Sequence, residues 1–295
     1  MQDLKKKTSE VAVSKPLSVV DHDRQAAGLL YVYPVVSRRA GGVSIGVNLN
    51  INNACNWRCV YCQVPDLTRG APPPVDLVRL RQELKGFLDD VLHGDFLVRR
   101  VEPQARRLND IALSGNGEPT SAKDFGAVVE LIGRVRQEAG VPEQVKTVLI
   151  TNGSLMHRPS VQAGVAGLRD LAGEVWFKLD RAPGAGMRRV NNARMGMERV
   201  RSNLEAAAGL CPTWIQTCMF AWNGLAPEEW ELQAYLDFLS ERLAAGVRLE
   251  GVLLYSLARQ SFQPEAGQLA ALPAGWLEAF AQRIRVLGLE VRVTP

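Results

Sequence analysis

Apolar runs and amphipathic stretches alternate along most of the chain. Short runs rich in branched apolar residues predict strands at 43–51, 110–113, 145–151, 175–179, 214–220, 252–257 and 289–293. Between them, apolar residues recur at helical spacing and predict helices at 75–92, 124–138, 161–171, 194–208, 227–243 and 273–287. Six or seven strand–helix units in succession favour one α/β domain with a parallel sheet. Right-handed crossovers would curl that sheet into a full or partial TIM-like barrel, and an open, doubly wound sheet is the alternative.

The same pattern divides the chain into three parts. Residues 1–30 are polar and mixed and predict an N-terminal arm, whereas 31–260 hold the regular alternation of a barrel core. Residues 261–295 add a helix and a strand that complete or cap the barrel. No run approaches the ~18 apolar residues of a membrane-spanning helix, and no apolar segment follows the lysines at 5–7, as a secretory signal would require. We therefore expect a cytoplasmic protein without a membrane partner.

Among the features of the composition, only the high arginine content bears on possible partners. The 295 residues are 46% hydrophobic, which excludes wholesale disorder, and 35 basic against 31 acidic residues give a net charge of +4. Arginine supplies 27 of the basic residues, with two groups at 99–107 and 181–201. Either group could attract an anionic small molecule or RNA, because the guanidinium matches phosphate and carboxylate. A solvated surface without a partner is the other interpretation.

The cysteines are too few and odd in number for a disulfide scaffold, but three of them lie together. Cys55, Cys59 and Cys62 fall within eight residues, directly after the first predicted strand. Three thiolates so close can hold one metal centre, either zinc or an iron–sulfur cluster. A structural zinc site would need a fourth ligand, and Cys211 and Cys218 lie about 150 residues away in the sequence. A [4Fe–4S] cluster on three cysteines would keep one iron open for a ligand.

The spacing Cys-x3-Cys-x2-Cys, with Tyr61 just before the third cysteine, resembles the radical S-adenosylmethionine (SAM) superfamily. The resemblance implies a partial (β/α)6 barrel of the radical SAM type, with a [4Fe–4S] cluster and SAM as cofactors. Cys55, Cys59 and Cys62 would be metal ligands and catalytic, and Tyr61 would lie at the cofactor. An electron from a flavodoxin or ferredoxin would cleave SAM to methionine and a 5′-deoxyadenosyl radical. That radical would abstract hydrogen from a small molecule, a nucleoside or RNA.

Further matches follow the later strands, where barrel enzymes place their chemistry. Residues 114–120 resemble the family's Gly-Gly-Glu-Pro element with an asparagine inserted, and 151–153 match a turn near SAM. Lys178 stands where relatives often carry a serine that contacts the SAM carboxylate, a contact an ammonium can also make. The resemblance implies cofactor contacts from Gly115, Asn116, Gly117, Glu118, Pro119, Thr151, Asn152, Lys178 and Asp180. Tyr255 near the end of the 252–257 strand and Arg259 just after it are weaker candidates for substrate or SAM contacts.

Within this superfamily, the chain resembles the bacterial relatives of the tRNA wybutosine-synthesis proteins. The stretches 34–39, 55–63, 114–120 and 151–155 carry this similarity, which covers about residues 31–260. The wybutosine enzymes proper hold a second cluster on cysteines before the motif, and residues 1–54 contain none. They also hold pyruvate on a lysine that has no identified counterpart in this sequence. Both differences argue against wybutosine synthesis itself.

Two cysteines remain outside the motif. Cys211 and Cys218 cannot complete an auxiliary cluster, and buried, inert thiols are the simplest interpretation. Alternation places Cys218 on the same strand face as Gln216 and Phe220. If that face lines the barrel, Cys218 could donate a hydrogen atom to a product radical and would then be catalytic.

Two other classes of function compete with a radical SAM enzyme. A non-catalytic iron–sulfur electron carrier or sensor would need the three cysteines but no SAM site, so the 114–120 element argues against it. A zinc-stabilised RNA-binding module would account for the cysteines and the arginines together.

Overall fold

The computed structural model of this chain describes residues 17, 28–37, 41–182 and 184–295. Almost all of the predicted arm, residues 1–30, lies outside the described residues.

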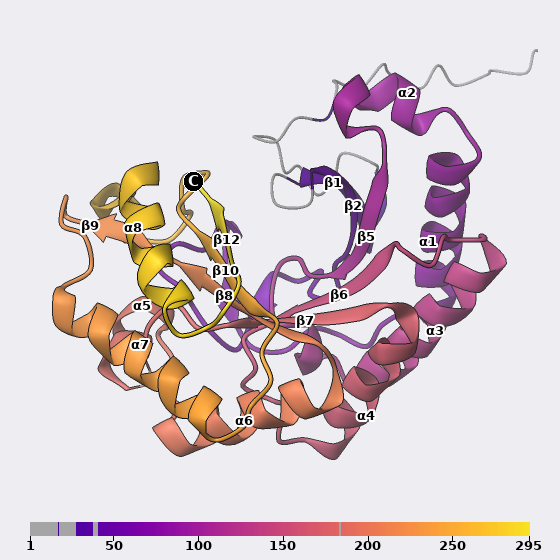
Figure 1. Cartoon of the computed structure of the whole chain (residues 1–295). Helices are drawn as coiled ribbons and strands as arrows, with labels where there is room; N and C mark the ends of the chain where they lie inside the picture. The colour runs from indigo at the N-terminus through magenta and orange to yellow at the C-terminus, as the bar shows by residue number, and fades with distance from the viewer. Residues whose placement is uncertain (1–16, 18–27, 38–40, 183) are drawn as a thin grey trace, which may run out of the picture.

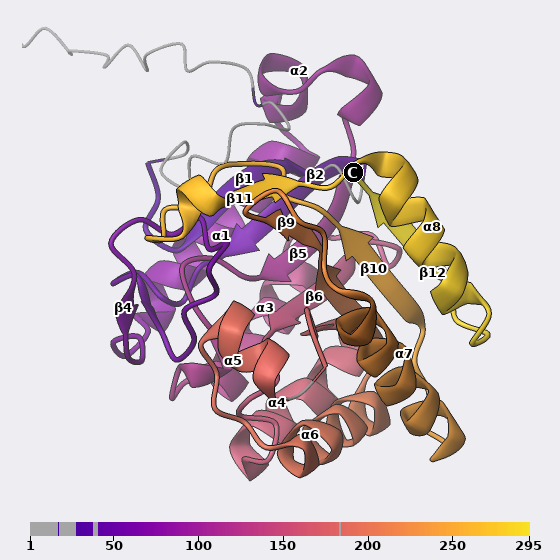
Figure 2. The ribbon, with the colours of Figure 1, turned by 90° about the vertical axis from the view of Figure 1, so that its left-hand side faces the viewer.

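Eight strands form one curved sheet, open between its two edges (Figures 1 and 2). In spatial order they are β1 (Val32–Ser37), β2 (Gly42–Val47), β5 (Leu108–Leu113), β6 (Lys146–Thr151), β7 (Gly173–Lys178), β8 (Thr213–Cys218), β10 (Gly251–Tyr255) and β12 (Val291–Thr294). Neighbours from β2 to β12 are parallel, and β1 joins β2 antiparallel. The spatial order follows the sequence order, whereas a doubly wound sheet would reverse at a switch point. The predicted partial barrel of six β/α units is confirmed.

Six helices lie along the outside of the curve (Figure 1). They are α1 (Leu77–Leu92), α3 (Phe125–Glu138), α4 (Pro159–Leu168), α6 (Met197–Leu210), α7 (Glu229–Ala244) and α8 (Ala274–Arg285). Helix α1 shows why these segments are helical: Leu80, Leu84 and Leu88 recur every four residues and are all buried. Asp76 caps its first turn by accepting a hydrogen bond from the Arg79 amide at 3.0 Å.

Alternation along the strands separates a dry face from a polar one. Ile45, Val175 and Ile215 point outward and are fully buried. Their neighbours Ser44 and Gln216 point inward and line a cavity. Because side chains alternate across a strand, the helices cover the apolar set and leave the polar set inside the curve. Among the described residues, no helix is both long and apolar enough to cross a membrane.

The structure corrects several predicted elements. The predicted strand 214–220 ends at Cys218, because the chain then leaves the sheet to form β9 (Phe220–Trp222), which pairs with β11 (Leu269–Ala271). Strand β1 was not predicted, since Pro34 weakens the strand signal, although an edge strand tolerates proline. The helix predicted at 194–208 spans 197–210 instead. Other unpredicted elements are α2 (Phe96–Arg100), α5 (Ala185–Asn191), β3 (Ala54–Cys55) and β4 (Thr68–Arg69).

Candidate functional site

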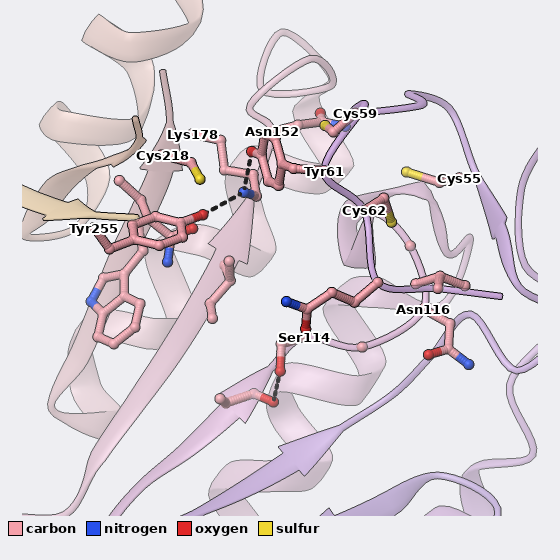
Figure 3. A pocket seen from close by; sticks show the side chains of 18 of the residues that line it. Cys55, Cys59, Tyr61, Cys62, Ser114, Asn116, Asn152, Lys178, Cys218 and Tyr255 are labelled. Carbon is pink, nitrogen blue, oxygen red and sulfur yellow. Dashed lines mark hydrogen bonds between the residues drawn. The ribbon is translucent and has the colours of Figure 1, made fainter. Parts of the chain in front are cut away.

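A cavity of about 300 Å³ lies inside the curve of the sheet (Figure 3). Its walls come from inward-facing strand residues, from the loop after β2 and from the loop after β5. Most of the residues predicted to act meet here: Cys55, Cys59, Tyr61, Cys62, Gly115, Asn116, Gly117, Glu118, Asn152, Lys178 and Cys218 line it, as do Tyr255 and Arg259. Three predicted cofactor contacts lie outside the lining: Pro119, Thr151 and Asp180.

The three motif cysteines share one loop that packing holds in place. The Cys62 amide donates to the Cys59 carbonyl at 2.9 Å, and the Gly70 amide donates to the Cys55 carbonyl at 3.1 Å. The Asn191 side-chain amide also donates to the Cys59 sulfur at 3.3 Å. Burial raises the pKa of Cys55 to about 11 and that of Cys59 to about 12. These two thiols are therefore protonated at neutral pH, and metal binding would have to release their protons.

The donor set consists of three cysteine sulfurs, the ligand type of iron–sulfur clusters. Among the described residues, no three His, Cys, Asp or Glu side chains are arranged to hold one metal ion. A cluster takes each thiolate on a different iron, so its ligands stand farther apart than those of one zinc ion. The three soft sulfur donors lining one cavity are the ligand type that such clusters use. The type and number of these donors therefore fit a three-cysteine cluster.

Glycines let the loop after β5 lie against the cysteine segment. Gly115 has φ = 139°, and a Cβ there would come within 2.4 Å of the Asn48 side chain. A Cβ on Gly117 would meet the Ala54 carbonyl at 2.2 Å. The backbone of this loop consequently forms part of the cavity wall at positions where any larger residue would push it away.

Glu118 holds this loop to the end of β6. Its side chain is buried and accepts hydrogen bonds from the Thr151 hydroxyl at 2.7 Å and the Asn152 amide at 2.6 Å. It also accepts from the Thr120 amide at 3.1 Å and hydroxyl at 2.6 Å. Burial raises the pKa of Glu118, and these four donors oppose the rise. Both carboxylate oxygens are thus occupied within the protein, and the predicted contact of Thr151 with a cofactor stays a prediction.

Lys178 sits at the opposite wall in a network of phenols (Figure 3). Its ammonium donates to the Tyr61 hydroxyl at 3.0 Å and to the Tyr255 hydroxyl at 3.3 Å. Burial lowers the pKa of Lys178, but the acidic groups around it, Tyr255 and Asp180 foremost, outweigh burial and raise it above the usual lysine value. Lys178 is therefore a cation inside the cavity.

Asp180 lies behind Lys178 and accepts hydrogen bonds from neighbouring parts of the chain. The Tyr61 hydroxyl donates to its carboxylate, and so does the Asn191 amide at 2.7 Å. The backbone amide of Cys218 donates to its other oxygen at 2.9 Å. The structure places Asp180 at the junction of three elements, and its predicted contact with a ribose stays a prediction.

Cys218 shares the inward face of β8 with Gln216, as alternation predicts. Phe220 belongs to β9 and packs on the Tyr61 ring, with centroids 5.6 Å apart. Burial raises the pKa of the Cys218 thiol above its usual value, so this sulfur keeps its proton. Cys211 is buried at the end of α6 and lies outside the cavity lining.

Polar residues within the strands were missed as site residues. Ser44, Asp110, Trp176 and Gln216 all line the cavity. The buried Gln216 Oε1 has no hydrogen-bond partner in the described part of the chain. The signal that could have identified them is a polar or aromatic residue at every second position within an otherwise apolar strand.

Comparison with known proteins gives short sequence matches and longer structural ones. No family model matches the chain. A UPF0026 protein of Helicobacter pylori is 28% identical over 134 residues, which cover 44% of this chain and 36% of that protein. A UPF0026 protein of Synechocystis sp. is 26% identical over 168 residues, covering 57% of this chain and 54% of that protein. The matches thus span from about a third to about half of these relatives.

Two solved structures share the fold. A radical SAM methyltransferase from Sphaerobacter thermophilus has a TM-score of 0.54 and is 14% identical, covering 86% of this chain and 66% of its own. TYW1 with a lysine–pyruvate adduct bound has a TM-score of 0.53 and is 16% identical, covering 84% of this chain and 74% of its own. The chain therefore has the partial-barrel fold of radical SAM enzymes, and the resemblance that the cysteine motif indicated is confirmed at the level of the fold.

Proposed function

We propose that this chain is a radical SAM enzyme. It would hold a [4Fe–4S] cluster on Cys55, Cys59 and Cys62 and bind SAM beside it. One observation carries the proposal: the three cysteines, the glycine loop after β5 and the Lys178 ammonium all line a single cavity. The proposed core is 31–260, and segment 261–295 would complete it, since Thr294 of β12 also lines the cavity.

When bound, the cluster would supply an electron for reductive cleavage of SAM, and the resulting radical would remove a hydrogen atom from the substrate. The protein has to bind and orient SAM and the substrate, and it has to exclude water from the cavity. The backbone at Gly115 and Gly117 allows close approach of a ligand to the wall, and Glu118 fixes that backbone. The phenols of Tyr61 and Tyr255 hold Lys178 so that its cation faces the cavity.

Lys178 is better suited to bind an anion than to react with a carbonyl. TYW1 has been solved with a lysine–pyruvate adduct, which requires a neutral amine. Lys178 is the only lysine lining this cavity among the described residues, and its raised pKa keeps it protonated. An ammonium at this position would pair with the carboxylate of SAM or of an anionic substrate.

Cys218 is the proposed hydrogen donor to a substrate-derived radical. Its protonated thiol faces the cavity, so it could transfer a hydrogen atom and form a carbon–hydrogen bond. The sulfur radical left behind would take one electron from the flavodoxin or ferredoxin-type donor and one proton from solvent to restore the thiol. The proposed substrate is a small molecule, which could be anionic, a nucleoside or RNA.

Anaerobic reconstitution with iron and sulfide tests the proposal. We expect about four iron and four sulfide per chain, and formation of 5′-deoxyadenosine when SAM and dithionite are added. A cluster that forms but never cleaves SAM would instead support the non-catalytic electron carrier or sensor. Binding of zinc with no cluster would support the zinc-stabilised RNA-binding module.

A further inference from the structure

Helix α5 connects the cysteine loop with an exposed face of the molecule. On one side, the Val190 carbonyl accepts a hydrogen bond from the Val60 amide at 2.9 Å, and the Asn191 carbonyl accepts one from the Arg58 amide at 3.3 Å. The Asn191 side chain also reaches the Cys59 sulfur at 3.3 Å. This short helix is therefore fixed directly against one of the three proposed cluster ligands.

The other side of the same segment carries exposed arginines. Arg188 and Arg189 lie on α5, Arg194 lies in the following loop and Arg199 lies in the first turn of α6, and all four are exposed. None of them forms an ion pair within the described residues; Arg189 lies over the Trp222 ring, 4.8 Å from its centroid. We call these four residues the α5–α6 basic surface. Figure 2 shows α5 and α6 on the same side of the molecule, with α5 above α6.

A neighbouring arginine adds to this charge. Arg69 is exposed and donates to the backbone carbonyl of Asn192 at 2.6 Å, without a carboxylate partner in the described chain. The one acidic residue in the segment 184–201 is Glu198, which lies 3.8 Å from Arg201, so the arginines leave an excess of positive charge. Such an excess raises the local potential and attracts a partner of the opposite sign.

The α5–α6 basic surface does not open into the cavity. No described residue from 181 to 215 lines it. A small-molecule substrate bound on this surface would not reach Lys178 or Cys218 without leaving it. A partner that needs only to lie close to the cysteines, however, would be well placed there. Electron transfer has this requirement, because it falls steeply with distance and needs no contact with the substrate.

We propose that the α5–α6 basic surface is the docking site for an acidic electron-carrier protein of the flavodoxin class. The docking site is inferred from the charge of this surface and from its position next to the Cys59 loop. The reduction of a cluster by the docked carrier rests on the proposed function. One electron would pass from the reduced flavin to the cluster through the wall formed by α5 and the Cys59 loop. The carrier would be oxidised by one electron and the cluster reduced by one, and no bond is made or broken in this step.

Charge reversal of the full-length protein tests this proposal. The variants are R188E/R189E and, to avoid the Trp222 contact, R194E/R199E. The matched control is R134E/R248E, which makes the same change in charge at two exposed arginines of α3 and of the loop after α7 that likewise have no ion pair in the described chain. Binding of an oxidised, acidic flavodoxin is measured by calorimetry at low and high salt. Formation of 5′-deoxyadenosine is measured with reduced flavodoxin and, separately, with dithionite, which needs no docking.

We expect both test pairs to weaken flavodoxin binding at low salt by at least about ten-fold relative to the control. High salt should remove most of the difference, because it screens exposed charges. Flavodoxin-driven turnover should fall in parallel, while dithionite-driven turnover stays at the wild-type level. Flavodoxin binding equal to the control in both pairs would overturn the proposal, as would loss of RNA binding with flavodoxin binding intact. If the wild type forms no 5′-deoxyadenosine with dithionite, the proposed function fails, while the binding measurement still decides the docking site.

Discussion

The two walls of the cavity each contain a charged residue, Glu118, which is buried, and Lys178, which is half-buried, and the two residues differ in how their hydrogen bonds are used. Glu118 accepts four hydrogen bonds from Thr120, Thr151 and Asn152, so its carboxylate is fully used within the protein. Lys178 has three N–H donors and two acceptors, Tyr61 and Tyr255. A buried polar group without a partner is costly. The difference supports a structural role for the Glu118 wall and is consistent with the ligand contact proposed for Lys178.

The largest effect is expected from the substitution of a motif cysteine. Cys59→Ala removes a proposed cluster ligand that also contacts Asn191, so we expect nearly complete loss of iron and sulfide after reconstitution. Iron analysis and visible absorption measure this. Cys211→Ala is the control, because it removes a buried cysteine outside the cavity and should keep the cluster. Full iron content in Cys59→Ala would contradict the assignment of this ligand.

Lys178→Gln tests whether the second wall binds a ligand. Loss of a charged hydrogen bond costs about 1.5–3 kcal/mol, so SAM should bind roughly 10- to 100-fold more weakly. Calorimetry on the reconstituted protein measures this, with Lys146→Gln, a lysine of β6 paired to Glu174, as the control. Unchanged SAM affinity in Lys178→Gln would show that the ammonium serves only Tyr61 and Tyr255.

Glu118→Gln tests the structural side of the comparison. The new amide brings N–H groups where the carboxylate accepted hydrogen bonds, so at least one donor loses its acceptor. We expect the free energy of unfolding in urea to fall by about 1–3 kcal/mol. Glu130→Gln, at an exposed glutamate of α3, should change it by less than about 0.5 kcal/mol. A Glu118→Gln protein as stable as the wild type would show that the four hydrogen bonds contribute little.

The comparison of the two walls also shows which features of the structure could be predicted from the sequence. The cysteine spacing and the strand–helix order are local signals, and both correctly predicted the fold. The hydrogen bond from the Thr151 hydroxyl to the Glu118 carboxylate could not be predicted from the sequence. It depends on how the 114–120 loop packs on the end of β6. Helix α5 gave no signal either, because its seven residues bury little beyond Met187, Val190 and Asn191. Its conformation depends on contacts with a loop about 130 residues earlier, which no local pattern records.

The smallest expected effect is the pH dependence that Glu118 gives to stability. Because burial raises its pKa in the folded protein, the folded state binds a proton more tightly than the unfolded state does. Its contribution is therefore present below the pKa of the unfolded chain and is lost as the pH rises through the higher folded pKa. Other carboxylates, such as Glu83 with its lowered pKa, affect both proteins equally. The difference in unfolding free energy, wild type minus Glu118→Gln, should therefore decline from acid to neutral pH. Parallel profiles for the two proteins would mean that the four hydrogen-bond donors cancel the effect of burial on the pKa of Glu118. The carboxylate would then stay ionised over this pH range.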